Sequence, residues 1–382
     1  MTELLDFLRS TGFYNIGWDN GVMIAVGLGF VYLAISKEWE PYELLPIGLG
    51  VIVANLPLTG LLTEPTAGAG YQDSGLFGII FHYGLAFWNF LPPIIFLGLG
   101  AMTDFSPIIS NPKTLLLGAA AQVGIFLAFW GALVSGQFSL AEASAIGIIG
   151  GADGPTTIFL AARLAPDLLG VTAVIAYSYM AAVAFIQPPL MKLLTTKKER
   201  EIEMPPIREV SRLEKLLFPS IAMVLIILIV PRSAPLVSMF MIGNLFRESG
   251  AVPRLTSAAS NELLNIATIF LMLTVGTQLS AETVFKVETL LILALGLVAF
   301  ACGTIGGLLF AKFMNLFLKE KINPLIGSAG VSAVPMAARI SHHMGQEANS
   351  RSFLLPHAMG PNVAGVIGSA VVAGMFISLV TS

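Results

Sequence analysis

The sequence predicts an all-α protein that crosses a membrane many times, and three observations support this fold class. Hydrophobic residues make up 55% of the 382-residue chain and charged residues only 11%, whereas a soluble domain carries about 25% charged residues. The mean hydropathy is +0.83. The apolar residues also gather in runs that approach the roughly 20 residues a helix needs to cross the hydrocarbon core. No basic stripe suits nucleic acid, and the net charge is only -3.

Apolar runs follow one another along almost the whole chain. Several are too short or too interrupted for one plain crossing, and the run that contains Pro92 and Pro93 is expected to form two pieces. We therefore expect about eleven membrane segments, some of them broken. The runs lie near 21–36, 43–62, 75–103, 114–136, 145–163, 168–190, 216–231, 234–247, 262–280, 288–312, 323–340 and 353–380.

The chain divides into four regions. Residues 1–20 carry a single basic residue and no small-residue cleavage pattern, so we expect an interfacial segment and not a signal peptide. Residues 192–215 are hydrophilic and contain seven Lys and Arg side chains, which predicts a linker on the cytoplasmic side. The two membrane regions are then 21–191 and 216–382.

These two membrane regions repeat one another. A shift of 176 residues pairs Gly151 with Gly327 and Thr156 with Ser332, and a shift of 174 aligns IFLGLGAMTDFS with IFLMLTVGTQLS. Internal repeats with interrupted segments at equivalent places are typical of transporters and indicate a binding site at the bilayer midplane. We expect the two repeats to be inverted relative to each other, as is common in such folds.

The stretch GIIGGADGPTTIFLAAR, residues 147–163, is the first interrupted segment. Its glycines and Pro155 break the helix around Asp153, because glycine allows positive φ and proline lacks a backbone donor. A broken helix is tolerated in a bilayer only where protein buries it or it lines a cavity. Asp153 could serve simply as a helix cap, but a carboxylate at that depth is costly. The glycines and threonines around it favour a functional site.

Two further stretches show the same pattern. NPLIGSAGVSAVPMAAR runs from Asn323 to Arg339 and includes Gly327 and Ser332, and HAMGPNVAGVIGSA includes Asn362. Asn, Ser and Asp oxygens are hard ligands that suit Na⁺ as they suit other hard cations. One carboxylate balances a monovalent ion, whereas Ca²⁺ sites gather more carboxylates. Arg339 stands near a segment end, where a basic side chain often extends to the interface.

The three motifs are similar to those of the membrane β-subunit of biotin-dependent, sodium-pumping decarboxylases, a family that includes the oxaloacetate, methylmalonyl-CoA, glutaconyl-CoA and malonate enzymes. The likeness covers nearly the whole chain. It implies that a separate carboxyltransferase moves CO₂ from the acid onto biotin, and that this subunit decarboxylates the carboxybiotin and exports Na⁺.

The resemblance also assigns roles to individual residues. Asp153 would bind Na⁺ and link it to the proton that decarboxylation consumes, and Asn323 and Asn362 would complete the Na⁺ site. An arginine is a natural partner for the carboxylate of carboxybiotin. The remaining matching positions are Tyr179, Ser332 and Arg339, with catalytic roles, and Gly327, which with Arg339 would bind the cofactor.

Partners and location follow from the same resemblance. It implies a biotin-carrier subunit, a cytoplasmic carboxyltransferase α-subunit, a small membrane subunit of γ or δ type, a homo-oligomeric arrangement in the complex, and the inner (plasma) membrane of a bacterium or archaeon. Composition, repeat and broken helices fit equally well an alternative, a Na⁺-coupled elevator-type secondary transporter of an organic anion. Only the motifs favour the decarboxylase subunit. A purely structural anchor would need no buried aspartate.

Overall fold

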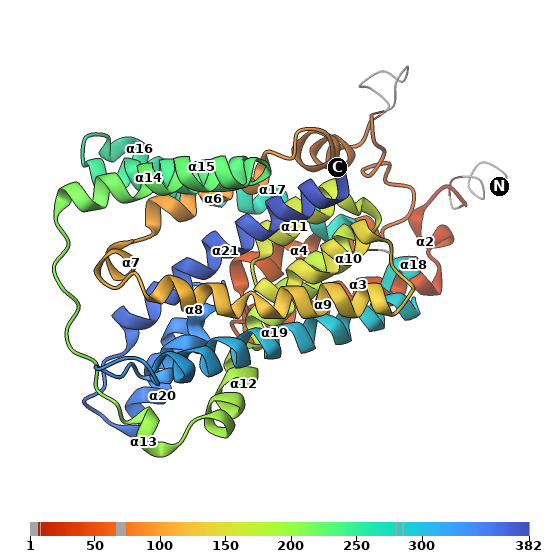
Figure 1. Cartoon of the computed structure of the whole chain (residues 1–382). Helices are drawn as coiled ribbons and strands as arrows, with labels where there is room; N and C mark the ends of the chain where they lie inside the picture. Colours follow the sequence, from red (N-terminus) through yellow and green to blue (C-terminus); the bar gives the residue numbers. More distant parts are fainter. Residues whose placement is uncertain (1–6, 8, 66–73, 280, 285, 382) are drawn as a thin grey trace.

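The regular secondary structure of the described residues is entirely helical, as the composition predicts. The computed structural model describes residues 7, 9–65, 74–279, 281–284 and 286–381, and within these ranges every regular element is helical (Figure 1). Among these described residues, five helices are long and apolar enough to cross a membrane, or up to seven if two bent pairs each count as one span. The prediction of a multi-pass helical membrane protein is therefore confirmed, while the estimate of about eleven segments stays a prediction.

The first half of the chain begins with a helical hairpin and ends with one long helix. Part of the predicted interfacial segment, residues 1–6 and 8, lies outside the described residues. The elements of this half are α2 (Gly12–Asn15), α3 (Trp18–Ser36), α4 (Pro41–Ala54), α5 (Leu76–Phe81), the π-helical η2 (His82–Phe87), α6 (Leu91–Met102), α7 (Ser106–Ser110), α8 (Thr114–Ala121), α9 (Val123–Val134), α10 (Leu140–Gly147), the 3₁₀ segment η3 (Ile148–Gly151), α11 (Gly154–Leu164), η4 (Pro166–Leu168) and α12 (Leu169–Leu194).

The second half follows the same order of elements. Its helices are α14 (Arg212–Ile229), η5 (Pro231–Ser233), α15 (Ala234–Ser249), α16 (Pro253–Ala258), the π-helical η6 (Ala259–Leu263), α17 (Leu264–Thr277), α18 (Ala281–Val284), α19 (Val287–Met314), the 3₁₀ segment η7 (Pro324–Gly330), α20 (Met336–Ala348) and α21 (Leu355–Thr381). Each half thus has a π-helical turn before an apolar helix and a 3₁₀ segment at its break. The two 3₁₀ segments begin 176 positions apart, at Ile148 and Pro324.

Each half also contributes a helix that packs on the other half. Helix α4 packs on α17, and α15 packs on α6. A Cβ on Gly50 would overlap the Leu273 carbonyl, and one on Gly243 would overlap the Leu97 carbonyl. Small residues allow such close helix approach inside a membrane. A similar helix contact is therefore made twice with the halves exchanged, once by α4 on α17 and once by α15 on α6.

Two buried asparagines strengthen these exchanged contacts. Asn55 Nδ2 donates to the Leu279 carbonyl at 3.0 Å, and Asn244 Nδ2 donates to the Thr103 carbonyl at 2.7 Å. Both acceptors lie just after the C-terminal ends of their helices, α17 and α6, where helix carbonyls lack an internal partner. The two side-chain amides therefore donate hydrogen bonds to backbone carbonyls that lipid could not hydrogen-bond.

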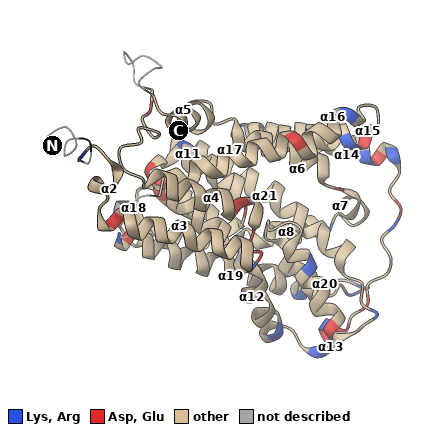
Figure 2. Ribbon diagram, turned by 180° about the vertical axis from the view of Figure 1, so that it is seen from behind, with Lys and Arg blue, Asp and Glu red and all other residues tan. Residues whose placement is uncertain are grey.

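The hydrophilic connection between the halves is shorter in the structure than its sequence suggests. Helix α12 continues to Leu194, the short helix α13 spans Lys197–Arg200, and α14 already begins at Arg212. Lys312 of α19 pairs with Glu199 at 3.2 Å, which holds this connection against the second half. Figure 2 shows Lys and Arg segments, with acidic segments among them, near α16 and again near α13 and α20.

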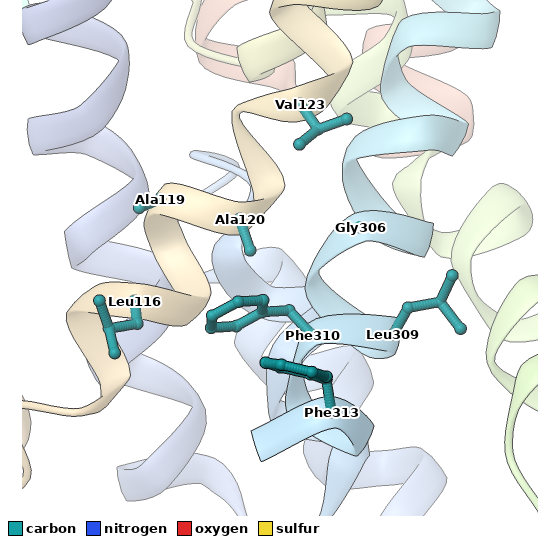
Figure 3. A pocket seen from close by; sticks show the side chains of 8 residues that line it. All are labelled: Leu116, Ala119, Ala120, Val123, Gly306, Leu309, Phe310 and Phe313. Carbon is teal, nitrogen blue, oxygen red and sulfur yellow. The ribbon is translucent and has the colours of Figure 1, made fainter.

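An apolar groove runs along the outside of the bundle, between α8, α9 and α19. Its volume is about 490 Å³, and Figure 3 shows that hydrocarbon side chains form its walls. Several of them are half exposed, including Leu116, Leu309 and Phe313. Exposed aliphatic and aromatic side chains along apolar helices of this length are those that contact lipid. The groove therefore belongs to the lipid-facing surface.

Candidate functional site

The first break is built by a change of backbone geometry over five residues. Helix α10 tightens into η3, Ala152 then takes the left-handed conformation with φ 52°, and Asp153 caps the start of α11. Asp153 Oδ1 accepts a hydrogen bond from the Thr156 backbone N–H at 3.1 Å. Pro155 fits the first turn of α11, where its missing donor costs nothing. The carboxylate ends up only 4% exposed.

The second break touches the first one directly. The Ser332 backbone N–H donates to the Gly151 carbonyl at 2.9 Å. The Ser369 hydroxyl, from α21, donates to Asp153 Oδ2 at 2.6 Å and lies 3.4 Å from the Ser332 hydroxyl. The Thr156 hydroxyl lies beside the same carboxylate. One carboxylate and several neutral oxygens from both halves of the chain therefore meet at one buried point.

Helix α21 holds the second break in place through Asn362. Its Nδ2 donates to the carbonyls of Val331 at 2.8 Å, Ala329 at 2.9 Å and Ala333 at 3.3 Å. Its Oδ1 is buried and has no hydrogen-bond partner among the described residues. Asn362 and Ser369 stand two turns apart and share one face of α21. This face presents a free amide oxygen and a hydroxyl to the junction of the two breaks.

A cavity of about 440 Å³ opens from this junction toward helices α4 and α17. Unlike the apolar groove of Figure 3, it carries polar groups on several walls. The two breaks contribute Asp153 and Ser332. The other polar lining residues are Glu40, Tyr42, Glu43, Tyr177, Ser260, Asn261, Asn265 and Thr268. The buried carboxylate is thus reachable by a small hydrophilic species.

The structure places the other expected residues away from this carboxylate. Asn323 caps η7, and its amide donates to the Arg200 and Ile202 carbonyls at 2.8 and 2.9 Å, so its described contacts are with the hydrophilic connection. Gly327 lies against α19, where a Cβ would overlap the Gly307 carbonyl. In this structure Asn323 and Gly327 shape and anchor the second break, and a direct part in ligand binding stays a prediction for both.

Tyr179 and Arg339 also point elsewhere. The Tyr179 hydroxyl donates to the Leu293 carbonyl of α19, and its ring lies against Gly296. Arg339 is exposed on α20. Three of the expected residues therefore lie around the two breaks: Asp153, Ser332 and Asn362.

Sequence reasoning missed two residues that the fold brings to Asp153. Ser369 stands in the third motif but carried no assigned role, because its distance from Asp153 in the chain hides their contact. Tyr177 lies two positions before Tyr179, and residues two apart point to different sides of a helix. The sequence does not show which side of α12 faces Asp153.

Gly154 is required by the approach of Tyr177. A Cβ at position 154 would overlap the Tyr177 ring and hydroxyl, so we expect Gly154→Ala to lower the free energy of unfolding by about 1–3 kcal/mol, the usual cost of overpacking. Thermal unfolding of the purified protein measures this. Gly29→Ala is the matched control, because nothing lies within 4 Å of that position and alanine favours a helix. Equal midpoints for the two variants would contradict the packing argument.

A polytopic helical fold in which two broken helices meet at a buried carboxylate is typical of a membrane transport protein. The sequence profile of the Na⁺-transporting oxaloacetate decarboxylase beta subunit matches residues 19–380. The chain therefore belongs to the family of Na⁺-transporting decarboxylase beta subunits.

Relatives of three kinds support the same family. The chain is 56% identical to the methylmalonyl-CoA decarboxylase subunit beta of Propionigenium modestum, with 99% of each chain covered. It is 52% identical to the glutaconyl-CoA decarboxylase subunit beta of Acidaminococcus fermentans, covering 100% of this chain and 98% of the relative. It is 47% identical to the oxaloacetate decarboxylase beta chain of Klebsiella pneumoniae, covering 100% and 99%. The similarity runs end to end in all three.

Proposed function

We propose that this chain decarboxylates carboxybiotin and uses that reaction to export Na⁺, with Asp153 as the residue where the two processes meet. The observation that carries the proposal is the single buried carboxylate at the contact between the two breaks, held by Ser369 and Thr156. Carboxybiotin takes up one proton when it loses CO₂ and becomes biotin. A carboxylate that holds either Na⁺ or a proton would exchange one for the other at this step.

The substrate acid is selected outside this chain. Three relatives, named as decarboxylase subunits for three different acids, are 47% to 56% identical to this chain along their full length. A common fold and site fit a common carrier, carboxybiotin, better than three unrelated acids. We therefore assign the acid to a carboxyltransferase subunit and the carboxyl transfer to a biotin-carrier subunit. A small membrane subunit and further copies of this chain complete the proposed complex, in the inner (plasma) membrane of a bacterium or archaeon.

The repeat is proposed to be inverted, with about eleven segments including the broken ones. The exchanged packing of α4 on α17 and of α15 on α6 supports a pseudo-two-fold relation between 21–191 and 216–382. A pair of broken segments placed symmetrically about such an axis can open a central site to either side in turn. The basic connection at 192–215 then lies on the cytoplasmic side, where an acidic soluble partner could dock.

The complete complex tests this function. We expect a purified complex reconstituted in vesicles to accumulate Na⁺ when given one of methylmalonyl-CoA, glutaconyl-CoA or oxaloacetate, and avidin to stop both decarboxylation and accumulation by binding biotin. Accumulation that avidin leaves unchanged, or that this chain alone performs down a gradient of an organic anion, would overturn the proposal in favour of a secondary transporter.

Arg339 is proposed to bind the carboxyl group of carboxybiotin from the exposed side of α20. Arg339→Lys keeps the charge but loses the two-pronged geometry that matches a carboxylate. We expect carboxybiotin decarboxylation to fall about tenfold or more, the effect of losing one charge-assisted hydrogen bond. Protection of the chain from proteolysis by Na⁺ should stay as in the wild type.

The control is Arg163→Lys, which makes the same change at the equivalent exposed position of the first repeat. It should leave decarboxylation unchanged. Equal losses in the two variants, or loss of Na⁺ protection in Arg339→Lys, would argue against a separate anion-binding role for Arg339.

A further inference from the structure

We propose that the Tyr177 hydroxyl is a ligand of the cation that binds at Asp153. This inference rests on the Na⁺ role proposed for Asp153 and adds a residue to that site. Tyr177 lies on α12, and its side chain is only 1% exposed. Its ring packs on Gly154, the residue directly after Asp153, so closely that a Cβ there would overlap it.

The Tyr177 hydroxyl has no hydrogen-bond partner among the described residues. Leaving a buried hydroxyl unpaired costs about 1–3 kcal/mol, and buried polar groups in native proteins are nearly all satisfied. Tyr179, two positions away, donates its hydroxyl to the Leu293 carbonyl. Of these two tyrosines of α12, only Tyr177 therefore keeps a hydroxyl that is free to bind a partner.

The cavity supplies the place for that partner. Tyr177 lines it together with Asp153 and Ser332. Asp153 and Ser332 line it where the two breaks meet, beside the Gly154 contact of Tyr177. Glu43 also lines this cavity, on the α4 side. A species beside the hydroxyl is thus close to acidic side chains of the cavity wall, which favours a cation over an anion.

The chemistry of the oxygens points to the class of cation. A phenol hydroxyl, the Ser332 and Ser369 hydroxyls and one carboxylate are hard, mostly neutral ligands. A single carboxylate balances a monovalent ion. We therefore assign Na⁺ as the cation that the Tyr177 hydroxyl oxygen binds. This binding uses the lone pairs of the oxygen and removes the cost of burying them unpaired.

The test compares Tyr177→Phe with Tyr32→Phe in the purified complex, following proteolysis of this chain while NaCl replaces choline chloride at constant ionic strength. Tyr177→Phe removes only the hydroxyl oxygen and fills the same space, so the folded chain should resist proteolysis in choline as the wild type does. We expect its half-maximal Na⁺ concentration for protection to rise about tenfold, the effect of one ligand to a charged group. Tyr32, 58% exposed on α3, should show no change.

Each other outcome has a defined meaning. An unchanged Na⁺ requirement in Tyr177→Phe overturns the inference, and so does a loss of resistance in choline with a normal Na⁺ response, which would make the hydroxyl structural. Asp153→Asn, measured in parallel, separates the two proposals. If Asp153→Asn keeps Na⁺ protection, the proposed function fails; if it loses protection while Tyr177→Phe does not, only the role of Tyr177 fails.

Discussion

Asp153→Asn is expected to abolish Na⁺ transport and the Na⁺-stimulated part of decarboxylation, each by more than about a hundredfold. The asparagine oxygen can still accept from the Thr156 N–H, which Asp153 Oδ1 does at 3.1 Å, so the break should keep its shape. The loss then reports the missing negative charge that balances Na⁺. Na⁺ uptake into vesicles and CO₂ release from the complex measure the two effects.

The pH dependence of the same site gives a second readout. A proton and Na⁺ compete for one carboxylate, so lowering the pH should weaken the apparent Na⁺ affinity of the wild type, and raising Na⁺ should make the site harder to protonate, because linkage is reciprocal. Na⁺ protection from proteolysis, titrated between acid and neutral pH, shows this directly. Asp153→Asn should lose the response at every pH.

Asp167→Asn is the control for this experiment, because it makes the same chemical change at an exposed aspartate of η4. It should transport Na⁺ as the wild type does. Near-normal pumping by Asp153→Asn, or Na⁺ binding in the wild type that does not depend on pH, would show that the assignment of Asp153 is wrong.

Asn362→Leu is expected to have the second largest effect. The substitution keeps the volume but removes the amide that bonds the Ala329, Val331 and Ala333 carbonyls. Buried carbonyls left without a donor cost about 1–3 kcal/mol each. The second break should therefore lose its geometry, the thermal unfolding midpoint should fall, and Na⁺ should no longer protect the chain.

Asn55→Leu provides the matched comparison. It also removes a buried amide, which in this case bonds the Leu279 carbonyl of the opposite half at 3.0 Å. Asn55 lies at the other end of α4 from the polar residues of that helix that line the cavity. Its unfolding midpoint should fall, while Na⁺ protection of the chain that remains folded should survive. Asn362→Leu with a normal Na⁺ response would exclude a role for this residue in the site beyond packing.

The sequence predicted the class and the two breaks for local reasons. In a membrane, the backbone N–H and C=O groups of these long apolar runs must be hydrogen-bonded within helices. The glycines and the proline around Asp153 interrupt one of these helices. The 176-residue shift that pairs Gly151 with Gly327 also pairs the starts of η3 and η7 in the structure. Family motifs identified the kind of protein, which the sequence profile confirms.

The number of spans was less accessible to the sequence. Several apolar runs become short, bent or paired helices, such as Leu76–Phe87 with Leu91–Met102 at 74°. An apolar run records that a segment is buried in lipid or protein, but both environments select the same side chains. Length alone therefore does not distinguish a crossing from a broken segment packed inside the bundle.

Only the tertiary structure decided which side chains meet at Asp153. The contact with Ser369 joins residues 216 positions apart, and no local pattern encodes such a distance. The choice of Tyr177 over Tyr179 depends on the rotation of α12 against α11 and α19, which is set by the close approach at Gly154 and Gly296. Local chemistry determined that the chain has a buried carboxylate at a helix break; packing between distant helices determined which oxygens surround it.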